Sequence, residues 1–270
     1  MKNQIENNLK ALISFITAGD PSLSMTEKIV YQLEKGGVDI IELGVPFSDP
    51  MADGPVIQAS SERALKKGTS LKDVLALVKK IRHRSKIPLL LMGYYNPIFA
   101  YGLSRYAKEA AKAGVNATLV VDLPPEESSD LDRELKKEGI DLIYLLTPTS
   151  DDARIKQVAR KARGFIYFVS MTGITGAKLQ SIFEIKKKIG RIRQLTRLPI
   201  VIGFGISTPE QAHQMSLLAD GVVVGSALVK LIHQNVAKPS KCLNKVENFA
   251  RSLRSSIKRD QGLVSSSLNP

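Results

Sequence analysis

The chain has 270 residues, 43% of them hydrophobic, a length sufficient for one α/β barrel or for two small domains with a real core. The single cysteine, Cys242, excludes an intrachain disulfide, and the N-terminus lacks the apolar stretch of a signal peptide, so we expect a cytoplasmic protein. No apolar run approaches the roughly 20 residues of a membrane span, and the net charge of +13 is spread over helical segments without a nucleic-acid-binding motif, so neither a membrane nor a nucleic acid is expected as a partner.

Short apolar runs rich in β-branched residues alternate with segments of helical period along the chain. Strands are expected at residues 12–17, 38–43, 88–93, 117–121, 141–146, 165–169, 199–204 and 221–224. Helices are expected at 25–35, 71–84, 104–113, 126–138, 151–162, 180–196 and 209–217, and four glycines, Gly36, Gly114, Gly139 and Gly164, are expected in the left-handed conformation at helix ends. Eight such units predict a (β/α)₈ barrel, a TIM barrel, rather than an open doubly wound sheet.

The second and third strands start 50 positions apart, at residues 38 and 88, which leaves room for a long loop and an extra helix. The strand pattern offers no domain boundary, so residues 1–270 are predicted to form a single TIM-barrel domain. Its core is expected at about residues 10–257, with a last helix at 243–257 and a frayed tail at 258–270.

Two carboxylates stand out, because a TIM barrel carries its active site at the C-terminal ends of the strands. Glu42 lies near the end of an apolar strand, on one face with Ile40 and Gly44. A lone buried carboxylate is costly, so Glu42 must be paired, protonated or used in chemistry. Asp53 lies in the long loop before Gly54. The alternatives are a buried ion pair for Glu42 and a helix N-cap for Asp53.

Two further candidates follow later strands. Asp122 ends the fourth strand, and Tyr167 lies on the sixth. Each has a structural alternative: Asp122 as a cap of the loop backbone or of the following helix, and Tyr167 as a core tyrosine with a bonded hydroxyl.

Glycines recur at the ends of strands six, seven and eight, at 173–176, 203–207 and 225–226. Glycine lets backbone N–H groups approach an anion, and a helix beginning at Gly225-Ser226 directs its positive end toward the ligand. We therefore predict a phosphate site, with tight βα turns as the alternative.

Residues 42–55, Glu-Leu-Gly-Val-Pro-Phe-Ser-Asp-Pro-Met-Ala-Asp-Gly-Pro, resemble one family closely. Together with 15–21, 94–99, 122–124 and the three glycine sites, they identify residues 12–232 as similar to the tryptophan synthase α subunit. The resemblance implies a TIM-barrel lyase. Its reaction is the retro-aldol cleavage of indole-3-glycerol phosphate to indole and glyceraldehyde 3-phosphate in tryptophan biosynthesis.

The resemblance also implies roles for individual residues. Glu42 corresponds to the general acid/base, Asp53 to the residue that bonds the indole N–H, and Tyr167 to the tyrosine beside the substrate. The implied substrate-binding residues are Phe15, Thr175, Gly176, Gly205, Gly225 and Ser226. Asp122 and Thr175 would link the end of strand four to a mobile lid after strand six, where Met171 and Lys178 depart from the residues common in relatives.

A partner is implied as well: the pyridoxal-phosphate-dependent β subunit, in an αββα assembly that passes indole between subunits. No cofactor or metal is expected in this chain, and the partner-facing loops would include Asp49-Pro50 and residues 96–99. Two alternatives stay open. One is a regulatory partner that activates the β subunit with weak or lost lyase activity, and the other is a different phosphate-binding barrel enzyme, such as a sugar-phosphate isomerase or an aldolase. None of the expected strands contains the lysine that a Schiff-base aldolase needs.

Overall fold

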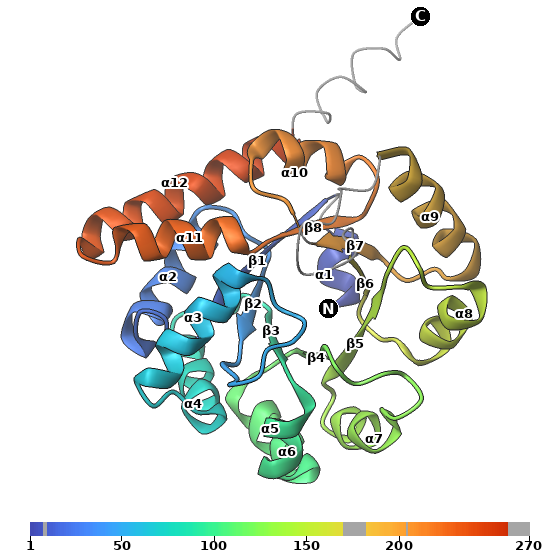
Figure 1. The fold of residues 1–270 in the computed structure, drawn as a ribbon, viewed down its shortest axis with the longest axis horizontal. Coiled ribbons are helices and arrows are strands. Elements are labelled where there is room, and N and C mark those ends of the chain that lie inside the picture. The colour runs from blue at the N-terminus through green and yellow to red at the C-terminus, as the bar shows by residue number, and fades with distance from the viewer. Residues whose placement is uncertain (8–9, 170–181, 204, 259–270) are drawn as a thin grey trace, which may run out of the picture.

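A computed structural model of the chain describes residues 1–7, 10–169, 182–203 and 205–258. Within these residues eight parallel strands form a closed barrel in chain order, with β1 also paired to β8 (Figure 1). The strands are β1 Ala11–Thr17, β2 Ile40–Gly44, β3 Leu89–Gly93, β4 Ala117–Val120, β5 Asp141–Leu146, β6 Ile166–Val169, β7 Ile200–Gly203 and β8 Gly221–Val224. The predicted TIM barrel is confirmed.

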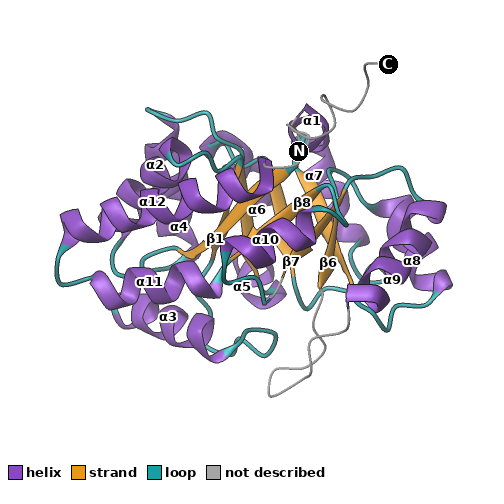
Figure 2. Cartoon of the chain, turned by 90° about the horizontal axis from the view of Figure 1, so that it is seen from above, coloured by secondary structure: helices purple, strands orange, loops and turns teal. Residues whose placement is uncertain are grey.

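The described helices from α2 onward form a ring around the barrel, and α1 lies over the centre of the barrel in the view of Figure 1 (Figures 1 and 2). The described helices are α1 Lys2–Asn7, α2 Leu23–Lys35, α3 Pro55–Lys66, α4 Leu71–Arg82, α5 Tyr95–Tyr101, α6 Leu103–Ala113, α7 Ser129–Lys137, α8 Asp152–Lys161, α9 Ile182–Leu195, α10 Pro209–Ser216, α11 Ser226–Asn235 and α12 Pro239–Lys258. The extra helix after strand two is α3, as predicted, whereas α1 and α5 were not predicted. Helix α12 starts at Pro239, earlier than expected, because proline is well tolerated in a first helical turn. Residues 259–270 lie outside the described residues.

Strand alternation divides the core into two shells. On β1, Leu12 and Ile16 pack outward against the helices, while Ile13 and Phe15 belong to the cluster inside the barrel. Ile5 of α1 joins the inner cluster, and α1 lies over the end of the barrel at which the strands begin (Figure 2). The interior is therefore filled with side chains except near the C-terminal strand ends. No helix in the described ranges is both long and apolar enough to cross a membrane.

The first helix-ending glycine was assigned incorrectly. Gly36 has a φ of −73°, and the next residue, Gly37, takes the left-handed conformation at +91°. Gly36 is required for space instead, because a Cβ there would lie 2.5 Å from Cβ of Ala250 on α12. The left-handed glycines Gly114, Gly139 and Gly164 are confirmed.

Helix α3 is fastened to the end of β1 by side-chain hydrogen bonds. The hydroxyls of Thr17 and Ser60 form a buried hydrogen bond of 2.6 Å. Arg63 makes two hydrogen bonds to the buried Asp20, at 3.0 and 2.6 Å. Such a bidentate pair constrains both side chains, so the second half of α3 is tied to the end of β1 and the residues that follow it.

Candidate active site

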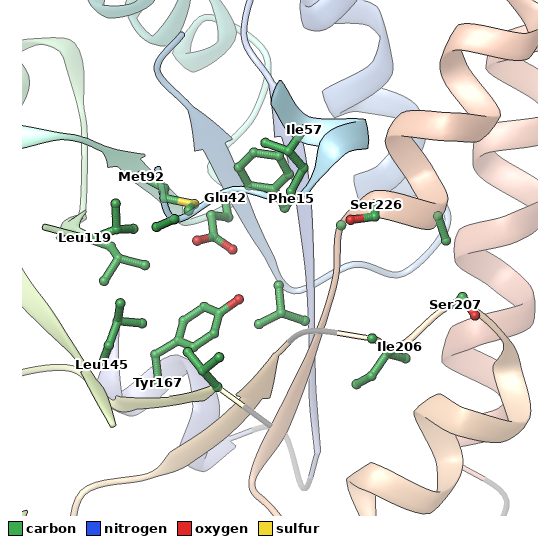
Figure 3. A pocket seen from close by; sticks show the side chains of 18 residues that line it. Phe15, Glu42, Ile57, Met92, Leu119, Leu145, Tyr167, Ile206, Ser207 and Ser226 are labelled. Carbon is green, nitrogen blue, oxygen red and sulfur yellow. The ribbon is translucent and has the colours of Figure 1, made fainter. Parts of the chain in front are cut away.

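A cavity of about 420 Å³ opens at the C-terminal ends of the strands (Figure 3). Its lining comprises Phe15, Glu42, Ala52, Gly54, Ile57, Met92, Leu119, Val121, Leu145, Tyr167, Val169, Gly205, Ile206, Ser207, Val223, Gly225, Ser226 and Ala227. Most of these side chains are apolar, and among the described lining residues only Glu42 and Tyr167 carry a titratable group. The cavity therefore suits an apolar ligand body with few polar attachment points.

Glu42 points into this cavity from β2, as strand alternation predicted, and lies in register with Phe15 and Leu90. Its side chain is buried, and neither carboxylate oxygen has a hydrogen-bond partner in the described part of the protein. Burial, with a smaller contribution from Asp53, raises the pKa of Glu42 to about 8. The alternative of a buried ion pair is therefore wrong for the described residues, and Glu42 is largely protonated at neutral pH.

Asp53 is also buried, but it lines a small adjoining cavity rather than the main one. Its Oδ1 has no hydrogen-bond partner among the described residues. Burial raises the pKa of Asp53 to about 6, and a hydrogen bond from Tyr94 opposes that rise. The N-cap alternative is wrong, because Gly54 occupies the N-cap of α3. Asp53 is thus mostly ionised at neutral pH beside a mostly protonated Glu42.

Tyr94 was missed by the sequence analysis. Its hydroxyl accepts a 2.9 Å hydrogen bond from the Ala52 N–H, and its ring stacks on Phe47 at a centroid distance of 5.1 Å. Strand alternation could have found it, because Tyr94 continues the inward series of Leu90 and Met92. Tyr94 ties the Asp53 loop to the end of β3.

Tyr167 faces Glu42 from the opposite side of the cavity (Figure 3). Its side chain is buried, and burial together with the charges of Glu42 and Asp53 raises the pKa of its hydroxyl well above the usual value. The hydroxyl is therefore neutral at any physiological pH. Its ring lies so close to Gly203 of β7 that a Cβ at that glycine would overlap it.

The predicted phosphate site is partly described. Gly205, Gly225 and Ser226 all line the cavity, and Ser226 is the first residue of α11 (Figure 3). The N-cap of α11 is Gly225, which has no side chain with which to occupy the first-turn N–H groups. The start of α11 can therefore receive an anion. Thr175 and Gly176, with Met171 and Lys178, lie outside the described residues.

Asp122 does not reach the cavity in this structure. Its exposed carboxylate accepts a 2.8 Å hydrogen bond from the N–H of Tyr95, the first residue of α5. The capping alternative is thus right in kind, although the helix is the one that follows β3 and not β4. The implied link from Asp122 to the lid falls on residues that the structure does not describe.

The comparisons with known proteins agree on one family. Residues 1–258 match the family described as tryptophan synthase alpha chain. The tryptophan synthase alpha chain of Geotalea uraniireducens is 52% identical over 256 residues, 95% of each chain. The crystal structure of tryptophan synthase subunit alpha from Legionella pneumophila superposes with a TM-score of 0.88 at 38% identity, covering 95% of this chain and 97% of that one. A chain in a structure of the tryptophan synthase α2β2 complex from Pyrococcus furiosus gives a TM-score of 0.82 at 37% identity, covering 91% and 98%.

Proposed function

The chain belongs to the tryptophan synthase alpha chain family, lyases of tryptophan synthesis, and we propose that it cleaves indole-3-glycerol phosphate to indole and glyceraldehyde 3-phosphate. The observation that carries the proposal is the pair of buried carboxyls in two adjoining cavities at the strand ends, Glu42 mostly protonated and Asp53 mostly ionised at neutral pH. Groups whose environments separate their pKa values are suited to separate acid and electrostatic roles.

The reaction needs a proton at indole C3 before the carbon–carbon bond breaks. The protonated Glu42 donates it, and positive charge then develops on the ring nitrogen, where the Asp53 carboxylate accepts a hydrogen bond from the N–H. The resulting Glu42 carboxylate removes the proton from the side-chain hydroxyl on the carbon attached to C3. As that C–O bond becomes an aldehyde carbonyl, the bond to C3 breaks and its electrons restore the aromatic indole.

The remaining cavity residues bind the two ends of the substrate. Phe15, Met92 and Leu119 offer an apolar surface for the indole ring, and Gly205, Gly225 and the start of α11 receive the phosphate. Tyr167, being neutral, can hydrogen-bond the reacting hydroxyl region without competing for its proton. Every step uses this chain's own residues and no cofactor.

The test is the release of glyceraldehyde 3-phosphate from indole-3-glycerol phosphate by the purified chain, alone and with a β subunit. Turnover in either condition supports the proposal. No turnover, with β-subunit activity still stimulated, would establish the regulatory alternative instead. The aldolase alternative has little support, because no lysine is among the described cavity residues.

The pH dependence of kcat/KM provides a second test. Asp53 must be ionised, so activity is expected to fall as the pH drops through about 6. Glu42 must start protonated, so activity is expected to fall as the pH rises through about 8. A bell-shaped profile with limbs near these values is therefore predicted for the free enzyme. A profile that keeps rising above pH 9 would contradict Glu42 as the initial acid.

We further propose that the chain assembles with a pyridoxal-phosphate-dependent β subunit in an αββα complex in the cytoplasm. The Pyrococcus furiosus structure is of a tryptophan synthase α2β2 complex. Met51, in the loop after β2, and Phe99, on α5 rather than in a loop, lie in the two segments implied to face the partner, and they are 80% and 62% exposed. Their apolar side chains are available for contact with a partner surface.

Met51→Asp and Phe99→Asp are each expected to weaken β-subunit binding at least tenfold, because either places a charge in an apolar interface. Binding is measured by titration calorimetry. The matched control is Leu217→Asp, since Leu217 is 54% exposed at the far end of α10. Equal loss of binding in all three variants would contradict the assigned interface.

A further inference from the structure

The side chain of Phe15 lies between the two cavities of the candidate active site. It lines the main cavity, which holds Glu42, and the small cavity, which holds Asp53. Ile57 and Met92 line both cavities as well, and in the main cavity they lie near Phe15 and Glu42 (Figure 3). Phe15 is also the register neighbour of Glu42 on the adjacent strand. Phe15 therefore belongs to the apolar lining beside Glu42.

Gly44 provides the space in which this ring lies. A Cβ at Gly44 would be 2.6 Å from Cζ and 2.7 Å from Cε2 of Phe15, distances that non-bonded carbon atoms do not adopt. On the other side, a Cβ at Gly225 would lie 3.3 Å from Cβ of Phe15. The Phe15 side chain thus lies between two glycines: Gly44, the last residue of β2, and Gly225, which follows β8.

The backbone conformation of Gly44 does not itself require a glycine. Gly44 ends β2, and its φ lies outside the left-handed range that side chains avoid. Glycine in a strand weakens it and commonly marks a close approach of another group. Here that group is the ring of Phe15, and only the end of the ring, beyond Cδ, meets the position that a Cβ would take.

We propose that Gly44 is a positioning residue for the lyase reaction, which holds the Phe15 ring in place and thereby keeps the Glu42 carboxyl dry. This inference rests on the proposed function, because it gives Glu42 a chemical task. A methyl group at residue 44 displaces the ring, admits water beside Glu42 and favours its ionised form. Glu42 then begins the reaction without the proton that indole C3 needs.

Gly44→Ala is expected to lower kcat about tenfold at pH 7.5, with KM changed less than threefold. The basic limb of the pH profile is expected to shift toward lower pH. Phe15→Leu removes Cε2 and Cζ, the atoms that the new methyl would overlap. In the Phe15→Leu background, Gly44→Ala is therefore expected to lower kcat less than twofold. A double-mutant cycle measures this non-additivity. The double variant also keeps the test valid if Gly44→Ala alone folds poorly.

A readout independent of catalysis separates this inference from the proposed function. The difference in unfolding free energy between each background and its Glu42→Gln variant, followed from pH 4 to 10, reports the pKa of Glu42. We expect the pH midpoint of this change in unfolding free energy to be lower in the Gly44→Ala background than in the wild type. Gly190→Ala on α9, where a Cβ meets open space, is the control and should change neither midpoint nor rate. An unchanged midpoint in Gly44→Ala, or additive costs in the cycle, would overturn the inference, whether or not the wild type proves to be a lyase.

Discussion

Glu42→Gln is expected to lower turnover at least about 100-fold, because the amide neither donates a proton to indole C3 nor removes one from the hydroxyl. The substitution keeps the size and shape of the side chain, so the cavity and its apolar lining are preserved. Substrate binding should therefore change little, and the loss should appear in kcat. A Glu42→Gln variant with near-wild-type turnover would remove the basis of the proposed mechanism.

The same substitution is expected to stabilise the protein near and above neutral pH. The pKa of Glu42 is raised by folding from 4.5 to about 8, so the folded state holds its proton more tightly than the unfolded state does. The contribution of Glu42 to the free energy of unfolding is therefore fully present below pH 4.5 and declines as the pH rises toward 8. At pH 7 the decline is on the order of 3 kcal/mol. Glutamine does not titrate, so this decline disappears from the variant.

Lower turnover together with higher stability distinguishes a catalytic carboxyl from a carboxyl that stabilises the fold. Replacing a buried group that stabilises the fold lowers the free energy of unfolding of the protein. The Glu42→Gln variant, in contrast, should be less active and more resistant to unfolding at pH 8. Denaturant unfolding at pH 5 and pH 8, with turnover assays on the same samples, measures both effects. Glu62→Gln on the exposed face of α3 is the matched control and should be near wild type in both. A loss of stability at pH 8 in Glu42→Gln would contradict the finding that Glu42 has no hydrogen-bond partner among the described residues.

The position of Glu42 could be predicted because it depends only on local rules. Alternation on a strand decides which side chains face inward, and a parallel barrel brings the ends of its strands together. The same rule places Tyr167 in the main cavity, and, continued past Met92, it would have placed Tyr94 in the small cavity beside Asp53. Strand and helix order follow from periodicity in the same way, which is why the eight units could be recognised without a structure.

The rest depends on distances between segments far apart in the chain. Gly44 is an unremarkable strand residue until the Phe15 ring is seen to fill the space beside it, and Gly36 is required because α12 packs against it. Asp53 would cap α3 if the helix began one residue earlier, but the N-cap position is occupied by Gly54. Side-chain contacts of this kind are set by packing and not by local preference, so periodicity cannot reveal them.

Asp53→Asn is expected to lower kcat/KM at least about 100-fold. The asparagine carbonyl can still accept a hydrogen bond from the indole N–H, so geometry is largely kept while the negative charge is lost. That charge acts in a buried site, where it stabilises the positive ring nitrogen far more strongly than it would in water. Because the charge matters only once C3 is protonated, the loss should appear in kcat more than in KM.

The pH profile of this variant decides whether the acidic limb belongs to Asp53. If Asp53 is the group with a pKa of about 6, the fall in activity below that pH should vanish in Asp53→Asn, while the basic limb assigned to Glu42 remains. Loss of a neighbouring negative charge should also move that basic limb slightly downward, since Asp53 contributes to the raised pKa of Glu42. Asp130→Asn on the exposed surface of α7 is the control for a change of net charge. An acidic limb that persists in Asp53→Asn would assign the ionisation near pH 6 to another group and leave Asp53 without its electrostatic role.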